Sequence, residues 1–368
     1  KYSGVFDQGY EAIREGILER QIGLGLLPAD TVLSPINPHG EPGRTGPDGQ
    51  PWPQLDTVRP WDTLTEEEQQ LFTRMAEVFA GYISYYDDRL GKVLDFLEES
   101  GELDNTLIVV TSDNGASGEG GPNGSFNEWR FFNGVPDTFD TTFPHLDELG
   151  TPASNNHYNT GWAWAMDTPF PYWKRWAGAE GGTADMCMVA WPAKIPASDE
   201  IRHQYVHAVD IVPTVYDLLG IEPPEVIKGF VQSPIEGESF AAALTDASVP
   251  GKRTQFYTML GQRSIYHDGW LACTVHPPLS SWGNFDKDEW ELYHVDADRS
   301  ESQNIAQENP DKLKNLVELW FNEAGKYNVL PLDDRSAVQI TTDPRPQPEP
   351  ERDTYIYFAG ASEVPEAV

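Results

Sequence analysis

Apolar residues recur at helical spacing over residues 71–97. Thr65 and Glu68, just before this series, have the spacing of a capping box, in which each side chain bonds the other residue's backbone amide. We therefore predict one long amphipathic helix that ends near Ser100. Residues 107–111 are all apolar or β-branched, which predicts a short strand buried on both faces. A helix followed by such a strand is typical of an α/β domain.

Further elements lie on both sides of this pair. Residues 10–24 predict a helix, the apolar run 186–191 predicts a second buried strand, and residues 207–220 predict a helix with Pro213 in its first turn. Residues 115–168 predict a long loop, longer than a plain connection between elements. Its glycine-rich part lacks the lysine of a phosphate-binding P-loop, so we predict no nucleotide site there.

The pattern changes near residue 251, where short runs separated by Gly or Asp predict an antiparallel sheet. The expected strands are 254–260, 263–267, 270–275 and 289–295, and an amphipathic helix is expected over 310–327. We interpret the chain as a larger domain, a smaller antiparallel α+β subdomain, and a proline-rich tail or linker with a final short strand at 355–358. These parts cover residues 1–250, 251–335 and 336–368.

The chain is strongly acidic, with 25 basic and 59 acidic residues and a formal net charge of −34. Nucleic acids and anionic membranes are bound through basic patches, so we expect neither as a partner. No run approaches 18 consecutive apolar residues, so we predict no membrane span. Cys187 and Cys273 lie in separate apolar runs and are expected to be free buried thiols, with a disulfide between them as the alternative.

Oxygen-bearing side chains follow directly where the strand 107–111 ends. Asp113 and Asn114 stand there, and Gly115 permits a sharp turn. In open α/β sheets, ligands collect outside the carboxyl ends of the strands, and a carboxylate beside an amide oxygen suits Ca²⁺ or Mg²⁺. The same residues are also ordinary turn chemistry. Two ligands alone do not make a metal site, so both interpretations stay open at this point.

Two cations stand together among aromatic residues, in a chain that has few cations. Lys174 and Arg175 lie in the stretch 168–176, which is rich in Phe, Tyr and Trp. A local pair of positive charges would let a strongly acidic chain bind an anion. His39 and Arg44 lie in a Pro/Gly-rich run and are expected to be solvated instead.

Several short motifs occur in order along nearly the whole chain. They are Lys1–Gly9, Ser-Asp-Asn-Gly at 112–115, the stretch 168–174, Glu-Gly-Gly-Thr at 180–183, His-x-x-Asp-Ile-x-Pro-Thr at 207–214, Trp-Glu-Leu-Tyr at 290–293, and residues 327–332. Together they resemble the type I sulfatases, in particular the large bacterial arylsulfatases.

The resemblance implies an α/β fold of the alkaline-phosphatase-like kind. This fold has a mostly parallel central sheet flanked by helices, plus a small C-terminal antiparallel sheet with a helix. The resemblance also implies that Asp113 and Asn114 are two ligands of a Ca²⁺, with Mg²⁺ less favoured, and that Lys174 binds the sulfate oxygens. Arg175 is adjacent and could be mistaken for this lysine, and Ala179 stands where the family often has a histidine.

The family's nucleophile is a formylglycine made within a Cys/Ser-x-Pro-Ser-Arg motif, which neither Cys187 nor Cys273 fits. The resemblance therefore implies that the nucleophile and the residues around it lie upstream of Lys1, and that related chains continue past Val368. We expect a chain cut at both ends, whose isolated form is inactive. Periplasmic, secreted and cytoplasmic locations all stay open.

The function implied by the resemblance is that of an arylsulfatase-type sulfuric ester hydrolase, with a small sulfated substrate, aryl or related, as its partner. One alternative is a phosphomonoesterase or phosphonate esterase on the same scaffold, because both oxyanions are tetrahedral. The other is a non-catalytic glycan-binding fragment in which some of the 12 tryptophans stack on sugars.

Overall fold

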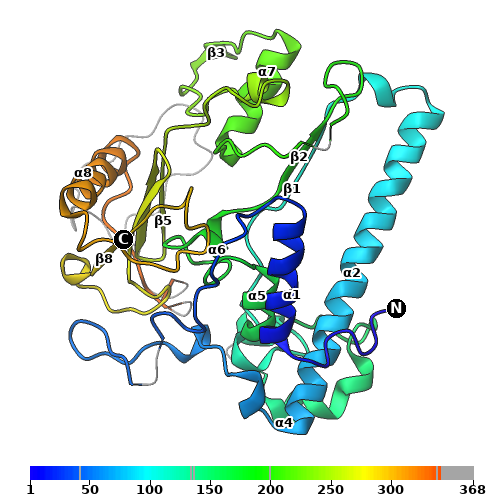
Figure 1. The fold of residues 1–368 in the computed structure, drawn as a ribbon, viewed down its shortest axis with the longest axis vertical. Helices are drawn as coiled ribbons and strands as arrows, with labels where there is room; N and C mark the ends of the chain where they lie inside the picture. Colours follow the sequence, from blue (N-terminus) through cyan, green and yellow to red (C-terminus); the bar gives the residue numbers. More distant parts are fainter. Residues whose placement is uncertain (41–42, 133–134, 136, 199, 337–338, 341–368) are drawn as a thin grey trace.

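The computed structural model describes residues 1–40, 43–132, 135, 137–198, 200–336 and 339–340 (Figure 1). The helices are α1 (Tyr10–Gly23), α2 (Glu66–Glu99), α3 (Trp129–Phe132), α4 (Phe139–Thr142), α5 (Thr160–Met166), α6 (Glu180–Thr183), α7 (Ile211–Leu219) and α8 (Pro310–Lys326). The strands are β1 (Ile108–Thr111), β2 (Cys187–Ala190), β3 (Val226–Ile227), β4 (Phe230–Val231), β5 (Thr254–Met259), β6 (Gln262–His267), β7 (Trp270–Thr274) and β8 (Trp290–Tyr293). The strand expected at 355–358 and most of the proline-rich tail lie outside the described residues, and the division into domains stays a prediction.

Helix α2 begins with the predicted capping box. Glu68 N donates to Thr65 Oγ1 at 3.2 Å, and Thr65 N donates to Glu68 Oε2 at 2.9 Å. The first half of the helix is packed into the core, with Leu71, Phe72, Met75 and Ala76 fully buried. The second half exposes at least half of each of Tyr82, Tyr85, Tyr86, Val93 and Phe96, and Figure 1 shows it standing apart from the rest of the chain.

Aromatic side chains build the core between α1, α2 and α5. Trp162 of α5 is fully buried, and its ring meets those of Tyr10 and Phe6 edge-on at centroid distances of 5.5 and 5.3 Å. The prediction of a loop throughout 115–168 is therefore wrong in part, since this stretch carries α3, α4 and α5. Helix α5 is only seven residues long and almost entirely buried, so it has no polar face from which helical spacing could be read.

Strands β1 and β2 lie where the sequence predicts them, but they are not buried on both faces. The residues of β1 are half-buried or exposed, and those of β2 are mostly exposed, including Cys187, which is a free thiol. The prediction of two buried thiols is correct only for Cys273. The faces of β1 and β2 stay accessible because no layer of helices covers them among the described residues. Burial of an apolar strand depends on such a layer.

The pairing of β1 with β2 is antiparallel, with Ile108 opposite Ala190 and Thr111 opposite Cys187. A mostly parallel central sheet is expected for the fold class, and within the described residues this part consists of β1 and β2 alone. No parallel neighbour of β1 is among the described residues.

The C-terminal antiparallel sheet and its helix are confirmed. Strands β5, β6, β7 and β8 pair in chain order, and α8 packs on one face of the sheet (Figure 1). Ile265, Leu292 and Trp320 are fully buried between the sheet and α8. Because β5, β6 and β7 are joined by two-residue turns that each contain a glycine, their pattern is visible in the sequence.

The helix predicted at 207–220 is also confirmed. It consists of a 3₁₀ turn followed by α7, and it ends at Gly220, whose φ of 65° is the left-handed cap that glycine favours. Asp210 accepts the His207 amide at 2.8 Å and lies 2.7 Å from Lys252 Nζ. This part of the motif therefore stabilises the fold.

Candidate functional site

The turn after β1 carries the two predicted metal ligands. Asp113 is exposed and Asn114 is half-buried. The Ser112 hydroxyl donates to the Asn114 carbonyl at 2.8 Å, and the Asn114 side-chain nitrogen donates to the Gly115 carbonyl at 3.0 Å. These bonds shape the turn. They use the side-chain NH₂ group of Asn114 as a donor and leave its side-chain oxygen without a role in the turn. Its side-chain oxygen is the atom that a hard cation binds.

A close contact between two loops places this turn beside the segment that carries Lys174. A Cβ atom on Gly115 would lie 1.9 Å from the carbonyl oxygen of Gly181, so no side chain fits there. The Lys174 amide donates to the Ala116 carbonyl at 2.9 Å. The structure thus places the backbone of Lys174 against Ala116, two residues after Asn114, although the two segments are far apart in the sequence.

Lys174 lies in a tightly constrained stretch of backbone. Tyr172 and Arg175, on either side of it, have φ values of 60° and 81°, a region that residues other than glycine rarely adopt. Trp173 and Trp176, which belong to the same stretch, have buried rings. Such conformations persist where the surrounding packing imposes them, and they cluster at functional sites.

Burial distinguishes Lys174 from its neighbour Arg175. The Arg175 side chain is 5% exposed, and its Nη2 lies 2.8 Å from Oδ1 of the buried Asp56. The Lys174 side chain is 33% exposed. Arg175 therefore stabilises the loop from inside, and Lys174 is the cation that a ligand can reach.

Glu119 is the partner of Lys174 in this structure. Its Oε2 lies 3.1 Å from Lys174 Nζ, and the same oxygen accepts a short hydrogen bond from the Ser117 hydroxyl. Burial alone would raise the pKa of the Glu119 carboxyl, but the hydrogen bond from Ser117 and the charges of Lys174 and Arg175 outweigh it and lower the pKa. Glu119 is therefore an anion at neutral pH.

Two further carboxyl groups stand near the turn, and the sequence reasoning missed both. Burial, together with the charge of Asp185, raises the pKa of the Asp167 carboxyl to about 8, although that carboxyl accepts the Ala116 amide. Desolvation also raises the pKa of Asp185; a hydrogen bond from Ser112 lowers it and the charge of Asp113 raises it. No local motif marks these residues, which come from separate parts of the chain.

A bound cation would suit the carboxylates at this turn. Besides desolvation, the charge of Asp113 raises the pKa of the Asp185 carboxyl, and a divalent cation beside them would offset that effect. No three His, Cys, Asp or Glu residues converge at metal-binding distance within the part of the chain that the structure describes. Since Ca²⁺ takes about six to eight oxygen ligands, Asp113 and Asn114 fit as two members of a larger set.

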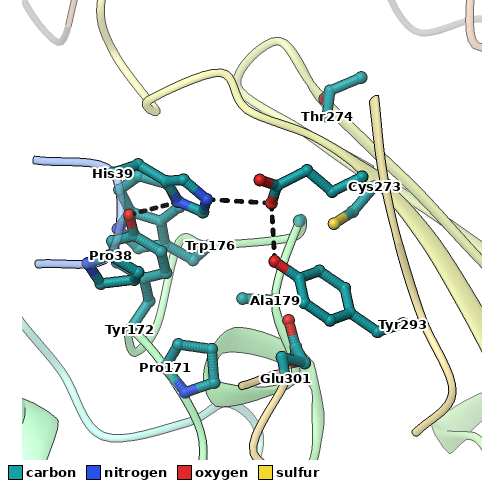
Figure 2. A pocket seen from close by; sticks show the side chains of 12 residues that line it. Pro38, His39, Pro171, Tyr172, Trp176, Ala179, Cys273, Thr274, Tyr293 and Glu301 are labelled. Atoms are coloured by element: carbon teal, nitrogen blue, oxygen red, sulfur yellow. Dashed lines mark hydrogen bonds and ion pairs between the residues drawn. The ribbon is translucent and has the colours of Figure 1, made fainter. Parts of the chain in front are cut away.

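His39 lines a small cavity behind the Lys174 segment (Figure 2). Its Nδ1 lies 2.8 Å from the Tyr172 hydroxyl, and its Nε2 lies 2.9 Å from Oε2 of Glu291, which also accepts the Tyr293 hydroxyl at 2.8 Å. The prediction that His39 is solvated is therefore wrong, because both ring nitrogens have protein partners. The cavity has a volume of about 20 Å³, which is room for a water molecule and too little for a sulfate ester. These bonds tie the Tyr172 segment to β8.

Comparison with known proteins identifies the family. The sulfatase family model matches residues 28–221, more than half of the chain. The chain is 29% identical to an uncharacterized sulfatase of Schizosaccharomyces pombe over 326 residues, which is 87% of this chain and 53% of that protein. It is 25% identical to the arylsulfatase of Klebsiella aerogenes, over 66% of this chain and 46% of the relative.

A third relative is the N-acetylglucosamine-6-O-sulfatase of Bacteroides thetaiotaomicron, which is 26% identical over 70% of this chain and 37% of the relative. The chain thus spans about half the length, or less, of the curated relatives it matches. Among the described residues, no helix is both long and apolar enough to cross a membrane. The chain belongs to the sulfatase family and has its alkaline-phosphatase-like α/β fold.

Proposed function

We propose that this protein is an arylsulfatase-type sulfuric ester hydrolase that cleaves aryl or related sulfate monoesters. Lys174 carries the proposal. Its ammonium group can be reached by a ligand, and its backbone is bonded to the loop that bears Asp113 and Asn114. The Lys174 ammonium group and a metal ion held by Asp113 and Asn114 would together attract an anionic ester, in spite of the net charge of −34.

Asp113 and Asn114 would hold a Ca²⁺, with Mg²⁺ the less favoured ion, and the bound ion would supply positive charge next to the sulfate group. Lys174 would bind a sulfate oxygen and stabilise the charge that develops as the ester bond breaks. This effect is stronger at a partly buried lysine than in water, because the local dielectric constant is lower.

The 368 residues contain no Cys/Ser-x-Pro-Ser-Arg motif. The proposed nucleophile is therefore a formylglycine supplied by a segment outside this sequence. We therefore expect the 368-residue chain alone to show no turnover. The substrate proposed is small and sulfated, and sulfated sugars are candidates beside aryl sulfates because one relative is an N-acetylglucosamine-6-O-sulfatase.

Hydrolysis of an aryl sulfate and of the matching aryl phosphate, by a protein that joins this chain to a formylglycine segment, tests the proposal. We expect the sulfate ester to react faster. Lys174→Ala and Asp113→Ala should each lower kcat/KM at least tenfold, or about 1.4 kcal/mol. Lys314→Ala, on a side chain that is 73% exposed, should change it less than twofold. Smaller losses at both site residues, or faster cleavage of the phosphate, would contradict the proposal.

A further inference from the structure

The anion that Lys174 binds in this structure comes from the chain itself. Glu119 Oε2 lies 3.1 Å from Lys174 Nζ, and its Oε1 lies 3.8 Å from Arg175 Nε. The Ser117 hydroxyl donates to the same carboxylate. Two cations and a hydroxyl donor around one carboxylate make the kind of site that also binds an inorganic oxyanion.

The cationic side of this site is built into the fold. Arg175 is 5% exposed, yet its Nε and Nη1 have no hydrogen-bond partner among the described residues. His157 Nε2 lies 2.8 Å from the Ser117 hydroxyl oxygen and holds it from the other side. Arg175 therefore faces the Glu119 carboxylate from inside the fold, while Lys174, which is 33% exposed, is the cation that an incoming anion can reach.

The backbone around Glu119 is closely packed, whereas its side chain reaches the surface. A Cβ atom on Gly118 would lie 2.0 Å from the Trp173 indole nitrogen, and one on Gly120 would lie 2.1 Å from the Tyr158 carbonyl oxygen. The backbone on both sides of Glu119 is therefore packed closely against buried residues. The Glu119 side chain itself is 22% exposed, so rotation toward solvent is open to it.

We propose that Glu119 competes inside the molecule with sulfate for Lys174. In the free protein the Glu119 carboxylate forms an ion pair with the Lys174 ammonium group. An incoming sulfate group takes its place and displaces the carboxylate toward solvent. Because Glu119 then recovers Lys174 when the product leaves, the competition lowers the affinity for free sulfate and favours its release. The inference rests on the proposed function, in which Lys174 is the sulfate-binding residue.

Titration of the 368-residue chain with inorganic sulfate in a calorimeter, in buffer that contains Ca²⁺, tests the inference. We expect Glu119→Gln to bind sulfate about tenfold more tightly than the unchanged chain, which corresponds to about 1.4 kcal/mol. Glu102→Gln, which removes the same charge at an exposed position, should change the affinity less than twofold. Lys174→Ala should abolish binding. Glu119→Ala provides a second variant in case Gln retains a hydrogen bond to Lys174 or disturbs the fold.

The two proposals fail in different ways. Sulfate binding that survives Lys174→Ala, or that is absent from the unchanged chain and from both Glu119 variants alike, overturns the proposed site and with it the inference. Binding that needs Lys174 but is equal or weaker in both Glu119 variants overturns only the competition by Glu119.

Discussion

The strands β5–β8 and the strands β1–β2 pair in the same antiparallel manner, yet different surroundings stabilise them. One face of β5–β8 lies under α8, with Ile265, Leu292 and Trp320 fully buried between them. The strands β1 and β2 are largely accessible, and Met188 of β2 is 53% exposed. The candidate site lies at the end of the less protected sheet.

This contrast shows that the sheet does not determine the geometry of the candidate site. Lys174 is positioned by the hydrogen bond from its backbone amide to the Ala116 carbonyl and by the packing of buried aromatic rings. Its loop is linked to β8 through His39 and Glu291. The sheet β5–β8 therefore supports the site through this link. A sheet with little cover can carry functional residues when the loops at its end pack tightly against a rigid neighbour.

The largest effect is expected in the core between the sheet β5–β8 and α8. Trp320→Ala removes a fully buried ring, and we expect the free energy of unfolding to fall by about 3–5 kcal/mol. Phe321→Ala, on the same helix but at a side chain that is 45% exposed, is the matched control and should cost less than about 1 kcal/mol. Chemical denaturation followed by tryptophan fluorescence measures both. Equal losses would remove the distinction between the buried and exposed faces of α8.

A buried histidine just after β7 should make the stability of the protein depend on pH. His276 is fully buried, with Nδ1 2.9 Å from Asp288 and Nε2 3.1 Å from Asp334. Burial by itself lowers the His276 pKa, but the hydrogen bonds and charges of the two aspartates outweigh it and raise the pKa above 6.5. The stabilisation is therefore complete below about pH 6.5 and is lost as the pH rises through the raised pKa.

We expect His276→Gln to lower the free energy of unfolding by about 3 kcal/mol at pH 6, because it leaves the buried Asp334 without a cation and Asp288 with Arg263 alone. The loss should shrink as the pH rises, by no more than about 1.4 kcal/mol per pH unit. His145→Gln, at an exposed histidine that pairs with Glu148, is the control and should show almost no change. Urea denaturation at several pH values gives the slopes. A loss at His276 that is independent of pH would show that its charge is not involved.

A smaller effect is expected at the start of α2, the helix that precedes β1. Thr65→Ala breaks the capping box, and we expect a loss of about 1 kcal/mol in the free energy of unfolding. Ser100→Ala, at the other end of the helix, should cost less, because the Ser100 hydroxyl donates to the Leu97 carbonyl in the last turn and caps no free amide. Thermal unfolding followed by circular dichroism compares the two. A greater loss at Ser100 would mean that the exposed half of α2 contributes more to stability than its packing indicates.

The smallest effect is expected in β2. Met188→Ala shortens a side chain that is 53% exposed, so we expect a change within about 0.5 kcal/mol in the 368-residue chain. Denaturation under the same conditions as for Trp320→Ala makes the two sheets directly comparable. A loss of about 2 kcal/mol or more would show that β2 is covered in solution, and would end the contrast between the sheets.

Elements with a local signal could be predicted closely from the sequence. The long helix, the strand before Asp113 and the four C-terminal strands all lie within a residue or two of their predicted bounds. Helix α5 could not be predicted in this way, because its seven residues are buried nearly all round and show no amphipathic period. For the candidate site, Asp113, Asn114 and Lys174 came from motifs, whereas Glu119, Asp167 and Asp185 have no motif and were missed.

The sequence by itself determined where α2 begins and where β1 ends at Asp113, because capping, periodicity and turn chemistry act over a few neighbouring residues. Only the tertiary structure decided which of two adjacent cations a ligand can reach. Arg175 is withdrawn by Asp56, which lies 119 residues away in the chain, while Lys174 stays partly exposed beside Glu119. Burial and ion pairing depend on contacts between distant segments, and no local pattern carries that information.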